Sequence, residues 1–202
     1  MSQRIGVFGG SFNPIHIGHL VIAEAARQEF DLKQVLFIPT GDTPNKTMHH
    51  ISKYARYRMV ELAVAGNPYF SVSPIELERE GPSYTVDTIR LLQKEMPGWE
   101  FFFIAGTDAV ADLPTWKYNR ELLEACHFIC ASRPGNEEKL KDTVRLFGDL
   151  GLRKIHFLRT PELEISSTIL RGLIRADRSV RYLMPDGVIQ YIKDNQLYKG
   201  TW

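Results

Sequence analysis

Cysteine, long apolar runs and net charge are all scarce in this sequence. Only Cys126 and Cys130 occur in 202 residues, too few for a disulfide framework, so we expect a reducing compartment, the cytoplasm. Their four-residue spacing would suit a metal site only with further ligands, and the sequence has no second cysteine pair. No apolar run is long enough to span a bilayer and no signal-peptide pattern is visible, so we expect no membrane partner.

The charges nearly cancel, with 25 Lys and Arg against 24 Asp and Glu and a formal net charge of +1. This balance gives no reason to expect a nucleic-acid partner. The hydrophobic content of 44% is ordinary for a globular protein. Because we find no repeat or Gly/Ser linker, we expect one domain over residues 1–202, with a helical portion from about residue 160. A homo-oligomer is left open.

Apolar segments alternate with segments of helical periodicity along the chain. Strands are expected at residues 4–8, 34–39, 70–75, 100–105, 127–131 and 154–158. Helices are expected at residues 20–30, 52–65, 84–96, 119–125, 137–150, 166–175 and 186–195, and a loop at 40–51. This alternation predicts an α/β fold, a doubly wound and mostly parallel sheet with helices on both faces. Ligands of such folds bind at the carboxyl ends of the strands.

Residues 9–19, GGSFNPIHIGH, join the first expected strand to the first expected helix. Gly9 and Gly10 permit close approach of a ligand to the backbone, and the following helix N-terminus suits phosphate oxygens. His16 and His19 lie three residues apart, so they share a face if the helix begins near them. They can donate hydrogen bonds and carry partial positive charge near neutral pH. The alternatives are an ordinary Gly-Gly turn and zinc-binding histidines, although no further zinc ligand lies nearby.

Residues 165–171, ISSTILR, form a second informative segment. The hydroxyls of Ser166 and Ser167 can cap a helix or donate to phosphate. Arg171 follows Ser167 by four residues, so its guanidinium can lie on the same face and bind phosphate oxygens. The alternative is an ordinary capped amphipathic helix.

Three further residues lie near expected ends of strands or helices. Asp108 follows the expected strand 100–105 and can accept hydrogen bonds from ribose hydroxyls, or cap the next helix. Trp116 can pack against the domain, or stack on a flat cationic ring such as a pyridinium. Thr85 offers a hydroxyl and a backbone N–H to an anion near a helix start.

Residues 9–19 resemble the GGxF(D/N)PxHxGH signature of the nucleotidyltransferase superfamily, and residues 165–171 resemble its I-S-S/A-T-x-x-R motif. With the segments around Thr85 and Trp116, the resemblance to bacterial nicotinate-nucleotide adenylyltransferases extends over nearly the whole chain. It implies a Rossmann-like fold and transfer of the adenylyl group of ATP to nicotinate mononucleotide. Mg²⁺ is the implied cofactor, accompanying ATP.

The resemblance also implies roles for individual residues. The implied catalytic residues are His16, His19 and Arg171. The implied ATP-binding residues are Gly9, Gly10, Ser11, Phe12, Gly106, Asp108, Arg133, Ser167 and Thr168. The implied nicotinate mononucleotide-binding residues are Lys46, Thr85, Trp116 and Lys117, and no protein ligand to a metal is implied. Asn13 and Asn45 depart from the Asp and His that many members carry at these positions.

Two other functions stay open from the sequence. One is nucleotidyl transfer to another phosphorylated acceptor, such as phosphopantetheine or glycerol phosphate, although the segments around Thr85 and Trp116 do not suit these acceptors. The other is a nucleotide-sensing domain without turnover, against which the complete set of phosphate donors argues. In the favoured reaction the acceptor phosphate, with a second pKa near ~6, is largely ionised at neutral pH, so no strong general base is expected.

Overall fold

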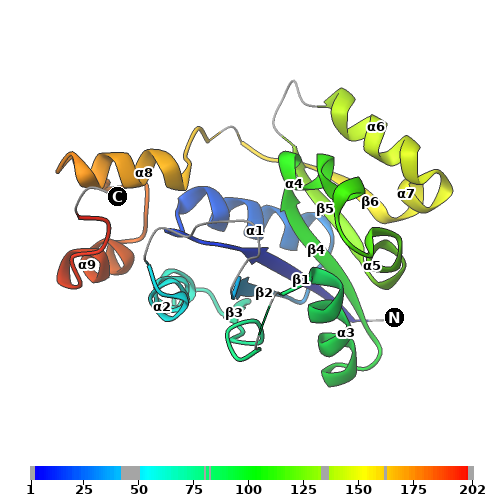
Figure 1. The fold of residues 1–202 in the computed structure, drawn as a ribbon, viewed down its shortest axis with the longest axis horizontal. Helices are drawn as coiled ribbons and strands as arrows, with labels where there is room; N and C mark the ends of the chain where they lie inside the picture. Colours follow the sequence, from blue (N-terminus) through cyan, green and yellow to red (C-terminus); the bar gives the residue numbers. More distant parts are fainter. Residues whose placement is uncertain are drawn as a thin grey trace. The chain divides into compact units, whose positions relative to one another are not determined.

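The computed structural model describes residues 3–41, 51–79, 81, 83–132, 137–161 and 163–199. Six strands form one sheet in the order β3-β2-β1-β4-β5-β6 (Figure 1). They are β1 (Gln3–Gly10), β2 (Gln34–Pro39), β3 (Phe70–Val72), β4 (Trp99–Gly106), β5 (His127–Ser132) and β6 (Ile155–Arg159). The pairs β1–β4, β4–β5 and β5–β6 are parallel. The order reverses beside β1, as in dinucleotide-binding α/β folds, so the predicted fold class is confirmed.

Helices separate the strands along the chain. Those before β4 are α1 (Ile17–Glu29), α2 (Lys53–Val64) and α3 (Thr85–Glu95). Those from β4 to β6 are α4 (Thr107–Ala111), the 3₁₀ turn η1 (Leu113–Thr115), α5 (Asn119–Ala125), α6 (Glu137–Phe147) and α7 (Asp149–Lys154). The last are α8 (Ser167–Arg175) and α9 (Asp186–Asp194).

The central strand β4 is covered on both of its faces. Phe101, Phe102, Phe103 and Ile104 point alternately to the two faces, and all four are buried. A strand that is buried on both faces has a continuous apolar sequence. The apolar run at residues 100–105 therefore predicted this strand correctly.

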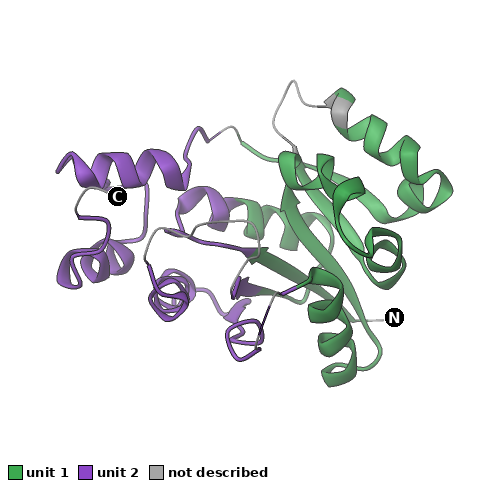
Figure 2. Cartoon of the chain, in the orientation of Figure 1, with its two compact units in different colours: residues 1–9, 22–36, 84–162 green, residues 10–21, 37–83, 163–202 purple. Residues whose placement is uncertain are grey.

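The chain groups into two compact units, each built from three separated segments (Figure 2). Unit 1 comprises Met1–Gly9, Ile22–Leu36 and Tyr84–Glu162, and unit 2 comprises Gly10–Val21, Phe37–Ser83 and Leu163–Trp202. The single domain expected over residues 1–202 stays a prediction.

Two differences between the expected and the observed elements involve glycine. The helix expected over 137–150 is interrupted at Gly148, whose φ of +58° is left-handed, and α7 begins one residue later. The strand expected over 4–8 extends to Gly10, and at Gly9 the lack of a side chain leaves room for the Phe103 ring, which would lie 3.1 Å from a Cβ. The helix α4 was not predicted, since its five residues are too few for a periodicity signal.

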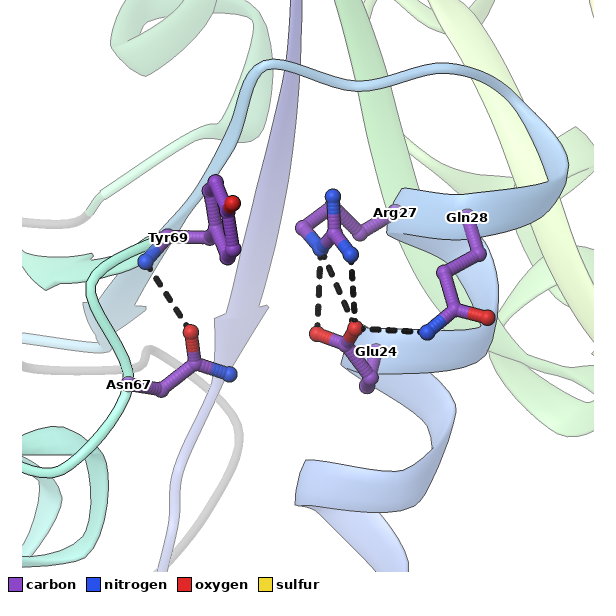
Figure 3. Close-up of polar contacts among 5 residues, drawn as sticks. All are labelled: Glu24, Arg27, Gln28, Asn67 and Tyr69. Atoms are coloured by element: carbon purple, nitrogen blue, oxygen red, sulfur yellow. Dashed lines mark hydrogen bonds and ion pairs between the residues drawn. The ribbon is translucent and has the colours of Figure 1, made fainter.

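Local polar contacts support α1 and the turn after α2 (Figure 3). On α1 the carboxylate of Glu24 accepts hydrogen bonds from the Arg27 guanidinium and from Nε2 of Gln28, the latter at 2.8 Å. In the turn that leads to β3, Oδ1 of Asn67 accepts the backbone N–H of Tyr69 at 2.9 Å. This is the local side-chain-to-backbone bond that makes asparagine favourable in turns.

Both cysteines are buried and free. Burial raises the pKa of each thiol to about 12, so both are neutral and unreactive at neutral pH. Within the described residues, no helix combines the length and the apolarity needed to cross a bilayer. The cytoplasmic location stays a prediction.

A polar cluster lies on one face of the sheet, towards the amino ends of the strands in unit 1. Nε of Arg4 donates to one Glu100 oxygen at 3.1 Å, and Nε2 of His127 lies 3.2 Å from the other. Nδ1 of His127 lies 2.8 Å from Nε2 of His156, and the two rings stack with centroids 5.1 Å apart. Burial is the main cause that lowers the pKa of His127 to about 4 and lowers the pKa of His156. The cluster therefore holds two neutral imidazoles at neutral pH.

The lowered histidine pKa values predict a loss of stability in acid. Since the folded pKa of His127 is about 4 and the unfolded value is about 6.5, the unfolded chain takes up the proton first as the pH falls. The stabilisation is complete above about pH 6.5 and is lost towards pH 4, an effect on the order of 1–3 kcal/mol.

Urea unfolding between pH 7.5 and 4.5 measures this loss. We expect the variant His127→Phe, which keeps a ring against Phe102, to lose less stability over this range than the unsubstituted protein. Equal losses in the two proteins would contradict the assignment.

Candidate active site

Residues 11–16, hereafter the signature loop, connect β1 to α1 without regular secondary structure in unit 2. Phe12 within it is left-handed, with φ of 44°, and is 2% exposed. Its ring packs edge-on against His19, at 5.2 Å between centroids, and tilted against Phe37, at 5.9 Å. Phe12 thus anchors the loop in the core, and its contact with ATP stays a prediction.

His16 and His19 come together at the start of α1, as their spacing predicted. Their rings lie 3.7 Å apart between centroids, and the backbone N–H of His16 donates to Nδ1 of His19 at 3.2 Å. Because Nδ1 of His19 accepts this bond, the proton of its neutral imidazole resides on Nε2. His19 can therefore present one N–H donor of fixed direction to a ligand.

The expected positive charge on His19 is wrong. Burial, and to a smaller extent the neighbouring His16, lower the pKa of His19 to about 3. Desolvation penalises the charged form of an imidazole, and a second imidazole at stacking distance adds to the penalty. His19 is therefore a neutral hydrogen-bond donor at neutral pH.

The segment 166–171 lies against the signature loop, so the two predicted motifs meet in unit 2. Ser166 caps α8, as predicted, by accepting the backbone N–H of Ile169. Oγ of Ser167 donates to the carbonyl oxygen of Pro14 at 2.8 Å. Nη1 of Arg171 donates to the carbonyl oxygen of Asn13 at 2.8 Å. Ser167 and Arg171 thus hold the backbone of the loop, and their contacts with phosphate stay a prediction.

Thr168 is the third polar residue predicted on this segment. Its hydroxyl oxygen accepts a hydrogen bond from Nη2 of Arg171 at 3.1 Å. This bond orients the guanidinium, whose other terminal nitrogen reaches Asn13. The positive charge of Arg171 is therefore fixed beside the signature loop.

Arg56 on α2 was not predicted, although it is one of the most buried side chains of the protein, at 2% exposed. Its Nη1 donates to the carbonyl oxygen of Ser11 at 2.8 Å and its Nη2 to that of Thr40 at 2.6 Å. The sequence carried a signal for it. Arg56 shares a helix face with Met59 and Val60, so a cation occupies an apolar position of the expected helix.

The end of β4, where the sequence predicted nucleotide binding, lies in unit 1. Gly106 is the N-cap residue of α4, and Asp108 lies exposed in the first turn. Asp108 does not cap this helix, so that alternative is wrong. The exposed carboxylate is free of the capping role and can accept hydrogen bonds from a ligand.

Trp116 is half-buried at the end of η1. Its ring contacts Phe103 and Phe128 edge-to-face, at 6.3 and 6.4 Å between centroids. Trp116 therefore packs on the domain and keeps part of its surface exposed, so stacking on a flat cationic ring stays a prediction beside its packing role.

Thr85 and Lys117 also belong to unit 1. Thr85 is the first residue of α3, where backbone N–H groups have no partner within the helix. The Lys117 ammonium lies 4.8 Å from the ring centroid of Tyr84 and 5.0 Å from that of Tyr118. A hydrogen bond to Tyr118 is the main cause that raises the pKa of Lys117, which therefore stays charged.

Of the remaining predicted residues, Ser11 lies in the signature loop and contributes its carbonyl oxygen to Arg56. Gly9 and Gly10 are the last two residues of β1. Lys46, Asn45 and Arg133 lie outside the described residues.

The family model described as cytidylyltransferase-like matches residues 7–173. A relative from Moorella thermoacetica named "Probable nicotinate-nucleotide adenylyltransferase" is 44% identical, over 97% of this chain and 92% of its own. A relative of the same name from Herpetosiphon aurantiacus is also 44% identical, over 97% of this chain and 98% of its own.

Solved structures of a Plasmodium falciparum nicotinic acid mononucleotide adenylyltransferase, complexed with NaAD and with APC, share the fold. Their TM-scores are 0.79 and 0.75, at 19% sequence identity and with 97% of each chain covered. The sequence matches carry the family assignment: this chain belongs to the cytidylyltransferase-like family and, within it, to the nicotinate-nucleotide adenylyltransferases.

Proposed function

We propose that the protein transfers the adenylyl group of ATP to nicotinate mononucleotide, forming nicotinate adenine dinucleotide and pyrophosphate. This proposal rests on the contact between the signature loop and residues 166–171 in unit 2. There His19 presents a neutral Nε2–H and Arg171 holds a fixed positive charge beside the same loop. Donors of fixed direction next to a helix N-terminus suit the phosphate chain of a nucleotide.

In this reaction a phosphate oxygen of nicotinate mononucleotide attacks the α-phosphorus of ATP. The new P–O bond forms as the bond between the α-phosphorus and the bridging oxygen breaks, and pyrophosphate leaves with the electron pair. The acceptor phosphate is already ionised at neutral pH. The protein must therefore position two anions and stabilise the charge that develops on the α-phosphate and the leaving group.

Charged groups and neutral hydrogen-bond donors have different roles in this task. His19 supplies a hydrogen bond without a charge, because its pKa of about 3 keeps it neutral. We assign the positive field to Arg171 and to the N-terminus of α1, with Lys46 as a further proposed phosphate contact. Asp108 is assigned to the ribose of ATP, as its exposed place at the end of β4 suits an acceptor.

The nicotinate ring is assigned to Trp116 and its carboxylate to Thr85 and Lys117. A half-buried tryptophan held by Phe103 and Phe128 offers a rigid surface to a cationic pyridinium ring. The backbone N–H of Lys117, directly after Trp116, would favour a carboxylate over a neutral amide.

Mg²⁺ is assigned to the phosphates of ATP. Among the residues that the structure describes, no group of three or more His, Cys, Asp or Glu side chains could hold a metal ion. The donors of the site are imidazole, hydroxyl, guanidinium and backbone N–H groups, which suit phosphate oxygens. Magnesium commonly binds through nucleotide phosphates and water, so the phosphates of ATP are its proposed ligands.

Pyrophosphate release separates this function from its alternatives. We expect rapid release from ATP with nicotinate mononucleotide, and little with phosphopantetheine or glycerol phosphate, or with CTP in place of ATP. Binding of ATP without release would instead indicate a nucleotide-sensing domain, and faster release with another acceptor would overturn the assigned substrate.

We predict that His19→Ala lowers kcat by about 10²–10³-fold, the usual cost of removing one preorganised donor from a developing anion. Steady-state pyrophosphate release measures this. The control His156→Phe removes an imidazole from the polar cluster in unit 1 and is expected to keep kcat. Near-normal turnover of His19→Ala would refute the role of His19.

We predict that Trp116→Leu raises KM for nicotinate mononucleotide by about 3–30-fold, the range of a lost cation–π contact, and leaves KM for ATP unchanged. Leucine keeps apolar packing against Phe103 and Phe128. The matched control is Trp99→Leu at the start of β4, and it should leave both KM values unchanged. Equal effects of the two variants on KM would remove Trp116 from the acceptor site.

A further inference from the structure

The closing segment of the described chain, residues 195–199, returns to the signature loop within unit 2. Gln196 and Tyr198 both have left-handed backbones, with φ of 51° and 64°. Such conformations are unfavourable for residues other than glycine, and they persist where surrounding contacts determine them. The backbone N–H of Leu197 donates to the carbonyl oxygen of Ile192 at 2.9 Å, which fixes the segment to the end of α9.

Tyr198 makes the contact that this backbone arrangement supports. Its side chain is 1% exposed, and its hydroxyl donates to Oδ1 of Asn13 at 2.6 Å, across 185 residues of sequence. Asn13 is also buried, at 4% exposed. A hydrogen bond between two buried groups is costly to break on one side only, because the remaining group stays unsatisfied.

Asn13 is held from two directions. Tyr198 binds its side-chain oxygen, and Nη1 of Arg171 binds its backbone oxygen at 2.8 Å. The next residue, Pro14, accepts the hydroxyl of Ser167. His16 follows after one more residue. The two held residues thus lie three and two positions before His16, whose backbone N–H binds Nδ1 of His19.

The hydroxyl of Tyr198 is a stable donor. Burial raises the pKa of Tyr198, while Arg171 and Arg56 act in the opposite direction. The phenol therefore stays protonated throughout the neutral range. The amide of Asn13 does not titrate either, so the bond between them is constant over that range.

We propose that Tyr198 is a positioning residue for catalysis, which fixes the signature loop through the side chain of Asn13 and so aligns His16 and His19. This inference rests on the proposed adenylyl transfer. Its physical basis is that the loop lacks a backbone ladder, so side-chain hydrogen bonds determine its place. A displacement of about 1 Å in a positioning element can cost as much as 10²-fold in rate.

The first test is Tyr198→Phe, which removes only the hydroxyl. We expect kcat to fall about 10-fold, with KM for ATP and for nicotinate mononucleotide within about 2-fold of the unsubstituted protein. The matched control is Tyr182→Phe, since Tyr182 is 84% exposed, and it should leave kcat unchanged. A kcat of Tyr198→Phe within 2-fold of the unsubstituted protein would overturn the proposal.

Variants of Asn13 separate positioning from a purely structural role. Asn13→Asp keeps an acceptor oxygen for the Tyr198 hydroxyl, so its kcat should fall less than that of Tyr198→Phe. The double variant Asn13→Leu with Tyr198→Phe replaces both polar partners by apolar groups, so its melting temperature should recover relative to Tyr198→Phe. We expect its kcat to stay low. Recovery of kcat together with the melting temperature would show that the bond contributes only to stability.

A readout without turnover distinguishes failure of this inference from failure of the proposed function. If the unsubstituted protein releases no pyrophosphate, the proposed function fails. The histidine ring signals in NMR spectra then test the positioning alone. Tyr198→Phe should shift the signals of His16 and His19 whereas Tyr182→Phe should not, and unchanged signals in Tyr198→Phe would overturn the inference.

Discussion

The candidate site depends on how the backbone oxygens of the signature loop are bonded. The loop forms no ladder of its own, and buried backbone groups without partners are costly. Side chains distant in sequence supply the donors: Arg56 binds Ser11, Arg171 binds Asn13 and Ser167 binds Pro14. One constraint thus serves two purposes, because the donors that fold the loop also bring charge and hydroxyl groups beside the two histidines.

The electrostatics of the site follow from the same burial. Desolvation and the second imidazole at stacking distance lower the pKa of His19 to about 3, so His19 is a directed neutral donor. Guanidinium groups keep their charge under the same conditions. Arginine thus supplies positive charge, and histidine supplies a hydrogen-bond donor of fixed direction. A catalyst that must position two anions benefits from both.

Unit 1 shows the same effect of burial on histidine. In unit 1 the lowered pKa values of His127 and His156 accompany a chain of hydrogen bonds that ends on Glu100 and Arg4. A lowered histidine pKa thus occurs in both units, and only the surrounding donors and the place in the fold suggest a function. Perturbed pKa values indicate candidate sites, and structural networks perturb them as well.

The sequence by itself determined most of the elements and their order. Alternating apolar and helical patterns predicted the strands. Local residue types and spacing predicted the cap at Ser166 and the proximity of His16 and His19, because these depend on neighbours within a few residues. Tertiary structure alone decided the charge of His19, the carbonyl partners of Arg56, and the bond between Tyr198 and Asn13. The physical reason is that a pKa depends on the whole enclosure of a group, and that a donor 185 residues away leaves no periodic trace in the sequence.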